Sequence, residues 1–209
     1  MNNQNLAVPE LATVEIHGMN RQAFILKSAF AAGAVYGAGA VSPFIRTALA
    51  QEGGGDVDIL NFALTLELLE ADFYTRVGKE VGLGGDAKKL ATELGENEEE
   101  HVDALTATIK ELGGKAVKEP KFTFPAKDQK SFLMLAQVLE DTGVSAYNGA
   151  APAIESKEVL AAAGSIVQIE ARHAAAIRLL NGDSPAPDAF DKTLSMDKVL
   201  KAVKPFIRA

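Results

Sequence analysis

The sequence has no cysteine among its 209 residues, which excludes disulfides, thiolate metal sites and thiol nucleophiles. Any metal site must therefore use oxygen and imidazole ligands, and the only histidines are His17, His101 and His173. Basic residues number 21 against 28 acidic ones. No concentrated basic stripe occurs, which argues against a nucleic-acid-binding surface. No segment shows sustained alternation of apolar and polar residues, so strands are not expected.

The first fifty residues have the composition of an export leader. Arg21 and Lys27 supply a positive start, an Ala/Gly-rich apolar stretch follows, and residues 48–50 (Ala-Leu-Ala) form a small-residue cleavage site. We therefore expect an exported protein, periplasmic, on the cell surface or extracellular, whose mature chain begins near Gln51.

An uncleaved membrane anchor is the alternative for the same segment. A membrane span needs about 20 apolar residues, and Pro43 and Arg46 interrupt the apolar stretch. The opening N-R-Q-A-F-I-L-K resembles a twin-arginine export signal, with Gln22 in place of the second arginine. Residues 1–18 are expected to be unstructured, and His17 is expected to have no role.

The rest of the chain has helical periodicity, which predicts an all-α fold. Asp56, Asp86 and Asp128 are candidate N-caps, and glycines follow the expected helix ends. The predicted helices span residues 56–77, 86–112, 128–152 and 156–180. The tail, residues 183–209, is expected to add one short helix, 197–203, packed against the others.

The connections between these segments predict how the helices pair. The first two helices and the last two have short connections, so each pair should form an antiparallel hairpin. Residues 115–129, with Pro120 and Pro125, lie between the hairpins. Extended, they span roughly 50 Å, more than the roughly 30 Å of a 20-residue helix. The sequence thus predicts one domain, residues 56–182, built as a four-helix bundle with one long crossover.

Two helices carry the same metal-ligand motif. Glu98 and His101 form one E-x-x-H, and Glu170 and His173 form another. A spacing of three places the carboxylate and the imidazole on one helix face. A single match is weak, because glutamate is common. Two matches are stronger, because together they account for both histidines that follow the leader.

The other two helices supply one carboxylate each. Glu67 and Glu140 stand in matching contexts, with a leucine seven residues before, an alanine four before, and Tyr74 or Tyr147 seven residues after. Glu67 precedes Glu98 by 31 residues, and Glu140 precedes Glu170 by 30. The two hairpins are therefore nearly in register. Glu70 also has inward-facing neighbours.

The repeat decides between the two glutamates of the first helix. The position that corresponds to Glu70 is Gly143, so the repeat favours Glu67. Apolar residues flank Glu98 and Glu170, and a carboxylate on such a face must be paired or bind a cation. Glu99 and Glu100 have polar neighbours and should point to water.

These residues predict a two-metal centre. Four carboxylates balance the charge of two divalent ions when both histidines are neutral, and oxygen-rich sites of this kind suit iron or manganese. Tyr74 and Tyr147 are interpreted either as hydrogen-bond donors to ligating carboxylates or as ordinary interior aromatics. The alternative for the whole set is a retired site whose groups form a buried hydrogen-bonded network.

From about Asp56 to Leu180 the sequence resembles the ferritin-like family, with a carboxylate on each of two helices and E-x-x-H on the other two. Segments 59–64 (Ile-Leu-Asn-Phe-Ala-Leu), 143–147 (Gly-Val-Ser-Ala-Tyr) and 189–191 (Ala-Phe-Asp) resemble an exported subfamily associated with stress or desiccation. The resemblance implies a set of metal ligands: Glu67, Glu98, His101, Glu140, Glu170 and His173.

The resemblance leaves two kinds of function open. One is redox chemistry of oxygen or peroxide, as in a ferrous-ion oxidase or a manganese catalase, with metal ions and small oxidants as partners. The other is a structural or protective stress protein without turnover. A storage cage fits less well with the leader and tail, although a homo-oligomer is compatible with the sequence.

Overall fold

The computed structural model describes residues 55–208. The expected leader, residues 1–50, and His17 lie outside the described residues. Among the helices of the described part, none is long and apolar enough to cross a membrane.

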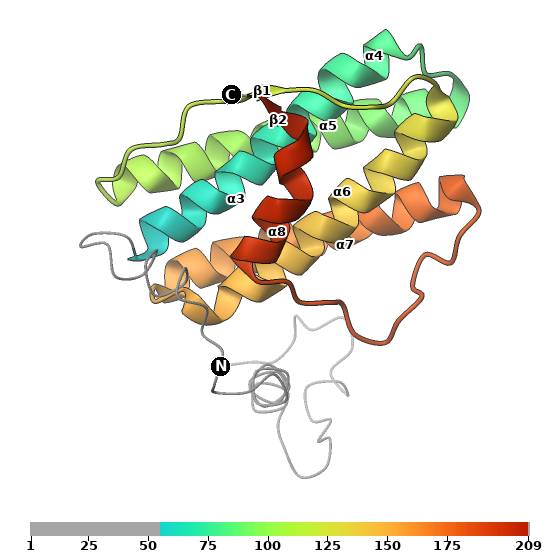
Figure 1. Cartoon of the computed structure of the whole chain (residues 1–209). Coiled ribbons are helices and arrows are strands. Elements are labelled where there is room, and N and C mark those ends of the chain that lie inside the picture. Colours follow the sequence, from blue (N-terminus) through green and yellow to red (C-terminus); the bar gives the residue numbers. More distant parts are fainter. Residues whose placement is uncertain (1–54, 209) are drawn as a thin grey trace, which may run out of the picture. The chain divides into compact units, whose positions relative to one another are not determined.

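Four long helices form the body of the molecule (Figure 1). Helix α3 packs along α5, and α6 packs along α7, so each predicted hairpin is present. The π-helical segment η2 and the short helix α4 prolong α3, and the 3-10 turn η3 prolongs α6. The bounds are α3 Gly55–Asp72, η2 Phe73–Val77, α4 Gly78–Glu80, α5 Gly85–Glu111, α6 Gln129–Ala150, η3 Ala151–Ala153 and α7 Lys157–Asn181. The predicted all-α bundle is confirmed.

Several helix ends follow from local sequence. The Asp128 side chain accepts from the backbone N–H of Ser131 at 2.8 Å, and the Ser131 hydroxyl completes a capping box by accepting from the N–H of Asp128 at 3.1 Å. Ser156 caps α7 by accepting from the N–H of Val159. Gly182 ends α7 with φ of 81°, a left-handed conformation that glycine adopts without strain.

Two of the expected N-caps are wrong. Asp56 lies inside the first turn of α3, and its carboxylate accepts from the backbone N–H groups of Glu155 and Ser156, both at 2.8 Å. It thus joins the two hairpins instead of capping its own helix. Asp86 also lies inside a helix, because extended Gly84 is the N-cap of α5.

The first helical rod also continues past its predicted end near Gly78. Gly78 keeps a right-handed helical conformation, and the side chains of Leu83 and Phe132 lie 3.3 Å and 3.8 Å from the position of a Cβ there. Close packing at this glycine, rather than its propensity to end a helix, decides the local structure.

The crossover contains a strand that the sequence did not predict. Strand β1 (Lys121–Phe122) pairs antiparallel with β2 (Ile207–Arg208). Two residues are too few to show period-two alternation, and the pairing joins segments far apart in the sequence. The tail also forms α8 (Met196–Val203) and the 3-10 turn η4 (Lys204–Phe206), which lead into β2 (Figure 1).

Aromatic rings hold the crossover and the tail against the bundle. Phe124 of the crossover contacts Phe73 at 5.1 Å between ring centroids, and Phe206 of the tail stacks on Phe124 at 5.6 Å. Phe73 stacks in turn on Phe132 of α6 at 4.3 Å. The tail therefore packs on the bundle.

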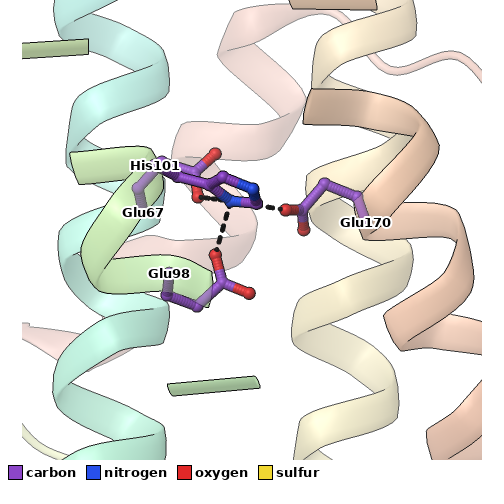
Figure 2. A group of neighbouring side chains, drawn as sticks. All are labelled: Glu67, Glu98, His101 and Glu170. Atoms are coloured by element: carbon purple, nitrogen blue, oxygen red, sulfur yellow. Dashed lines mark hydrogen bonds and ion pairs between the residues drawn. The ribbon is translucent and has the colours of Figure 1, made fainter. Parts of the chain in front are cut away.

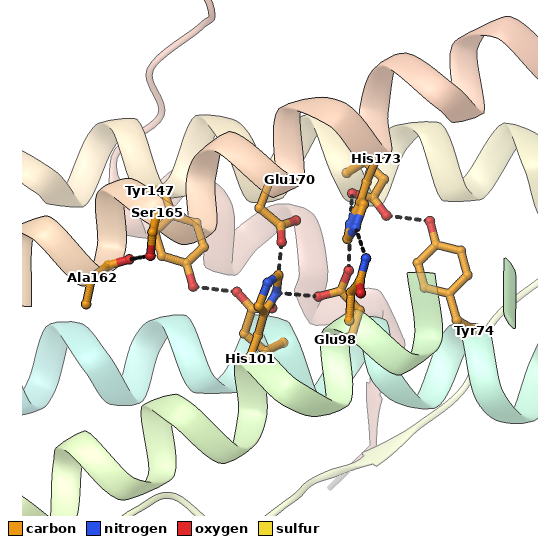
Figure 3. A network of polar contacts seen from close by, with 11 residues as sticks. Tyr74, Glu98, His101, Tyr147, Ala162, Ser165, Glu170 and His173 are labelled. Atoms are coloured by element: carbon orange, nitrogen blue, oxygen red, sulfur yellow. Dashed lines mark hydrogen bonds and ion pairs between the residues drawn. The ribbon is translucent and has the colours of Figure 1, made fainter. Parts of the chain in front are cut away.

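The core consists of two apolar clusters, one toward each end of the bundle. Tyr74 and Phe132 belong to the larger cluster, which also receives Val199 and Val203 from α8. Tyr147 belongs to the smaller cluster, with Leu105 and Ile109 of α5 among its members. The polar residues described next lie among the helices between these two tyrosines (Figure 3).

Candidate metal centre

Each of the four long helices sends one fully buried carboxylate into the bundle. Glu67, Glu98, Glu140 and Glu170 are each 0% exposed. His173 is buried as well, and the His101 side chain is 12% exposed. The structure thus brings together all six side chains that were predicted from the sequence as candidate metal ligands.

The first group of ligand atoms surrounds His101 (Figure 2). The His101 Nδ1 atom lies 3.1 Å from Glu67 Oε2 and 3.1 Å from Glu98 Oε2. It also lies 3.2 Å from Glu170 Oε1, a carboxylate from the opposite hairpin. One ligand atom from each of these four residues falls within 4.8 Å of the others, which is close enough to surround a single ion.

The second group surrounds His173 and reuses two of the same carboxylates. Its members are Glu98, Glu140, Glu170 and His173. His173 Nδ1 lies 2.8 Å from Glu98 Oε1 and 3.5 Å from Glu140 Oε2. The two imidazole rings stand 6.2 Å apart. Glu98 and Glu170 belong to both groups, so the two sets of candidate ligand atoms adjoin one another.

Several polar atoms in these groups lack a hydrogen-bond partner. The contacts to the imidazoles are short, but many do not have hydrogen-bond geometry. Buried polar atoms are normally paired, and among the described residues no lysine or arginine forms an ion pair with these carboxylates. A cation would satisfy them, so the donor set fits a metal. The unpartnered atoms are Glu98 Oε1, Glu140 Oε2, Glu170 Oε1 and Oε2, and His173 Nδ1.

Burial and mutual repulsion disfavour ionisation of most of these acids. Burial is the largest influence on Glu67 and, with repulsion from Glu98, raises its pKa to about 8 despite the contact with His101. Burial likewise raises the pKa of Glu140, and burial with repulsion from Glu67 and Glu98 raises that of Glu170 well above its ordinary value. The metal-free cluster therefore retains protons at neutral pH.

Glu98 and the histidines behave in the opposite way. Burial acts to raise the pKa of Glu98, but contacts with both imidazoles outweigh it and lower the value to about 2. Burial acts to lower the histidine pKa values, yet the surrounding carboxylates raise that of His101 to about 12 and that of His173 to about 10. In the metal-free state, the imidazolium groups supply the positive charge that metal ions would otherwise bring.

The two tyrosines hydrogen-bond across the bundle, each to a carboxylate of the other hairpin (Figure 3). The Tyr74 hydroxyl donates to Glu140 Oε1 at 2.5 Å. The Tyr147 hydroxyl donates to Glu67 Oε1. Burial and the adjacent carboxylates raise the pKa of both phenols well above the ordinary value, so both remain protonated donors. In the structure, both tyrosine hydroxyls therefore act as hydrogen-bond donors to carboxylates of the cluster, so the two residues are not purely apolar core residues.

Two further polar residues lie at the centre: Asn97, which sequence reasoning missed, and Glu70, which it did not choose as a ligand. The amide nitrogen of Asn97 lies 3.0 Å from His173 Nε2; its counterpart in α7 is Ile169, so the repeat offered no signal. Glu70 is 3% exposed and was set aside because its counterpart is Gly143. The inward-facing neighbours of Glu70 correctly indicated its burial, whereas the repeat did not. Glu99 and Glu100 are exposed, as expected.

A comparison of the sequence with protein-family profiles decides the classification. The profile described as "Ferritin-like domain" matches residues 55–183, which is more than half of the chain. The chain belongs to the ferritin-like domain family. A search of the curated proteins finds no match.

A solved structure supports the same fold for this ferritin-like protein. The crystal structure of a conserved hypothetical protein from Mycobacterium tuberculosis aligns with a TM-score of 0.56 and 18% identity. The match covers 67% of this chain and 99% of the other. At this identity the likeness concerns the fold alone. The buried cluster of this ferritin-like bundle is compatible with a metal site.

Proposed function

We propose that the protein binds two ions of iron or manganese and uses them for redox chemistry of oxygen or peroxide in stress protection. The observation that carries this proposal is the set of buried, unpartnered carboxylate and imidazole atoms, divided into two groups that share Glu98 and Glu170. Hard oxygen donors with one nitrogen per ion suit iron and manganese better than softer metals.

Each residue has a distinct part in this proposal. Glu67 and His101 would hold one ion, Glu140 and His173 would hold the other, and Glu98 and Glu170 would bridge them. When bound, the two ions supply reversible one-electron steps toward oxygen or peroxide.

The chain's own groups would prepare the site by moving protons. Metal binding requires deprotonated carboxylates and neutral imidazoles, so the protons held by Glu67 and by the His101 and His173 rings have to leave. Tyr74 and Tyr147 keep donating to Glu140 and Glu67, which leaves one oxygen of each carboxylate for an ion. These hydrogen bonds fix the carboxylate orientation.

We also propose that the protein acts outside the cytoplasm. The support is the composition of residues 1–50 and the resemblance of three segments to an exported, stress-associated subfamily. N-terminal sequencing of the protein from its native source should return a start near Gln51. A start at residue 1 or 2 would instead favour an uncleaved anchor.

The test of the central proposal is metal content combined with turnover. Protein purified without chelators is analysed for iron and manganese, and is then assayed for oxygen consumption with ferrous ion and for peroxide breakdown. About two ions per chain with activity in one assay supports the proposal. Two bound ions without turnover favour the non-catalytic protective role. Absence of bound metal after incubation with either ion refutes the metal centre.

A further inference from the structure

The centre contains a fifth buried carboxylate that the repeat does not explain. Glu70 lies on α3 one turn beyond Glu67 and is 3% exposed. Its Oε2 atom is buried without a hydrogen-bond partner. A buried polar group left without a partner costs roughly 1–3 kcal/mol, so a compensating interaction is expected at this position.

Gly143 of α6 provides the space for this carboxylate. A Cβ at Gly143 would lie 3.4 Å and 3.6 Å from the two oxygens of Glu70, and 3.2 Å from Glu170 Oε2. The carboxylates of Glu70 and Glu170 therefore approach the same point on α6, one turn beyond Glu140. Gly143, which breaks the repeat, therefore leaves room on α6 for the carboxylate that Glu70 adds on α3.

The neighbours of Glu70 indicate which of the two ion positions it faces. Burial raises the pKa of Glu70 well above its ordinary value, and repulsion from Glu170, Glu140, Glu98 and Glu67 adds to this, so Glu70 belongs to the same cluster of acids. Glu170 belongs to both groups and does not distinguish them, so the direction along α3 decides. Glu70 lies on the side of Glu67 that leads to Tyr74, and the Tyr74 hydroxyl donates to Glu140.

We propose that Glu70 is a seventh ligand of the metal centre, at the ion position that Glu140 and His173 define. This rests on the proposed two-metal function. The two positions then differ: the one at His101 has a single terminal carboxylate, and the one at His173 has two. Five carboxylates exceed the charge of two divalent ions by one, so the His173 position favours an ion of higher charge.

The test uses variants that each retain one imidazole. In His101→Ala the position at His173 keeps its nitrogen ligand, and in His173→Ala the position at His101 does. Glu70→Gln preserves shape and removes the charge. It is added to both backgrounds, and Mn²⁺ binding to the metal-free proteins is measured by calorimetric titration. Glu99→Gln, an exposed neighbour, is the matched control, and circular dichroism verifies the fold.

The expected result is asymmetric. Glu70→Gln should weaken Mn²⁺ binding about tenfold or more in the His101→Ala background and leave it nearly unchanged in the His173→Ala background. If a double variant does not fold, Glu70→Gln alone should weaken one of the two binding events of the otherwise native protein. Equal weakening in both backgrounds, or none, overturns the assignment of Glu70. Failure of the native protein to bind Mn²⁺ overturns the two-metal function itself.

Discussion

The two helical hairpins of the bundle are alike where they reach the centre and different immediately beside it. Each contributes a glutamate, an E-x-x-H pair and a tyrosine, and the glutamate spacings differ by one residue. Yet Glu70 of the first hairpin faces Gly143 of the second, and Asn97 corresponds to Ile169. The repeat thus accounts for the six shared groups, whereas divergence around them makes the surroundings of His101 and His173 unequal.

Of the changes considered, removing one imidazole should have the largest effect on metal binding by the two hairpins. His101→Ala and His173→Ala should each reduce bound metal from about two ions per chain to about one, because in each variant one ion loses its only nitrogen ligand. Elemental analysis after incubation with Mn²⁺ measures this. Glu99→Gln should retain the native content, because its side chain is exposed. Identical metal content in the Glu99 and His101 variants would contradict the ligand assignment.

Removing one tyrosine hydroxyl tests whether the two halves are equivalent beyond the ligands. Tyr74→Phe leaves Glu140 without its donor, and Tyr147→Phe does the same to Glu67. Each should weaken Mn²⁺ binding about tenfold, a typical effect of losing a hydrogen bond to a ligand. Titration of the two metal-free variants provides the comparison. Unchanged affinity in both would return the tyrosines to the role of interior aromatics.

The pH dependence of stability should separate the metal-free protein from the loaded one. The pKa of Glu67 is raised to about 8, so its contribution is complete below the ordinary value of 4.5 and is lost as pH rises. The contributions of His101 and His173, whose pKa values are raised to about 12 and about 10, are complete below 6.5 and are also lost at higher pH. Glu98, with its pKa lowered to about 2, loses its contribution only as pH falls below 4.5.

The melting temperature of the metal-free protein should therefore fall between about pH 5 and about pH 8. Metal affinity should rise over the same range, because the ligands must lose protons to bind. The stabilisation by Mn²⁺ should consequently grow with pH, which thermal melts with and without the ion would show. A stabilisation that stays constant or shrinks toward pH 8 would contradict the protonation states described above.

The smallest expected effect is on thermal stability and concerns the first turns of α6 and α5, one helix from each hairpin. Asp128→Ala removes the capping box of α6 and should lower the melting temperature by a few degrees. Asp86→Ala is the matched control, because α5 begins at Gly85 without a side-chain cap and, within residues 55–208, the ion pair of Asp86 is with exposed Lys89. Equal melting temperatures of the two variants would show that the capping box adds no stability.

Much of this molecule follows from short-range sequence patterns. The helix hairpins, the cap at Asp128 and the stop at Gly182 depend on neighbouring residues and on periodicity. The convergence of six polar groups follows from the internal repeat, because matched spacings place the acids of all four helices at one level. These features could be predicted from one sequence.

The features that could not be predicted depend on contacts between distant residues. Asp56 accepts from backbone groups about a hundred residues away and therefore does not act as the local cap that its position suggested. Gly78 stays helical because Phe132 packs against it. Glu70 enters the centre because Gly143 leaves room on another helix. In each case a tertiary contact overrides a local preference.

The pairing of β1 with β2 has a consequence for biosynthesis. Residues 121–122 of the crossover meet residues 207–208, and Val199 and Val203 of α8 enter the larger apolar cluster. A ribosome adds residues at about 5–20 per second, so roughly 1–5 seconds separate the end of α7 from the residues that close the crossover. The ring of Phe124 cannot receive that of Phe206 before then, so closure of the crossover by the tail is a late step of biosynthesis.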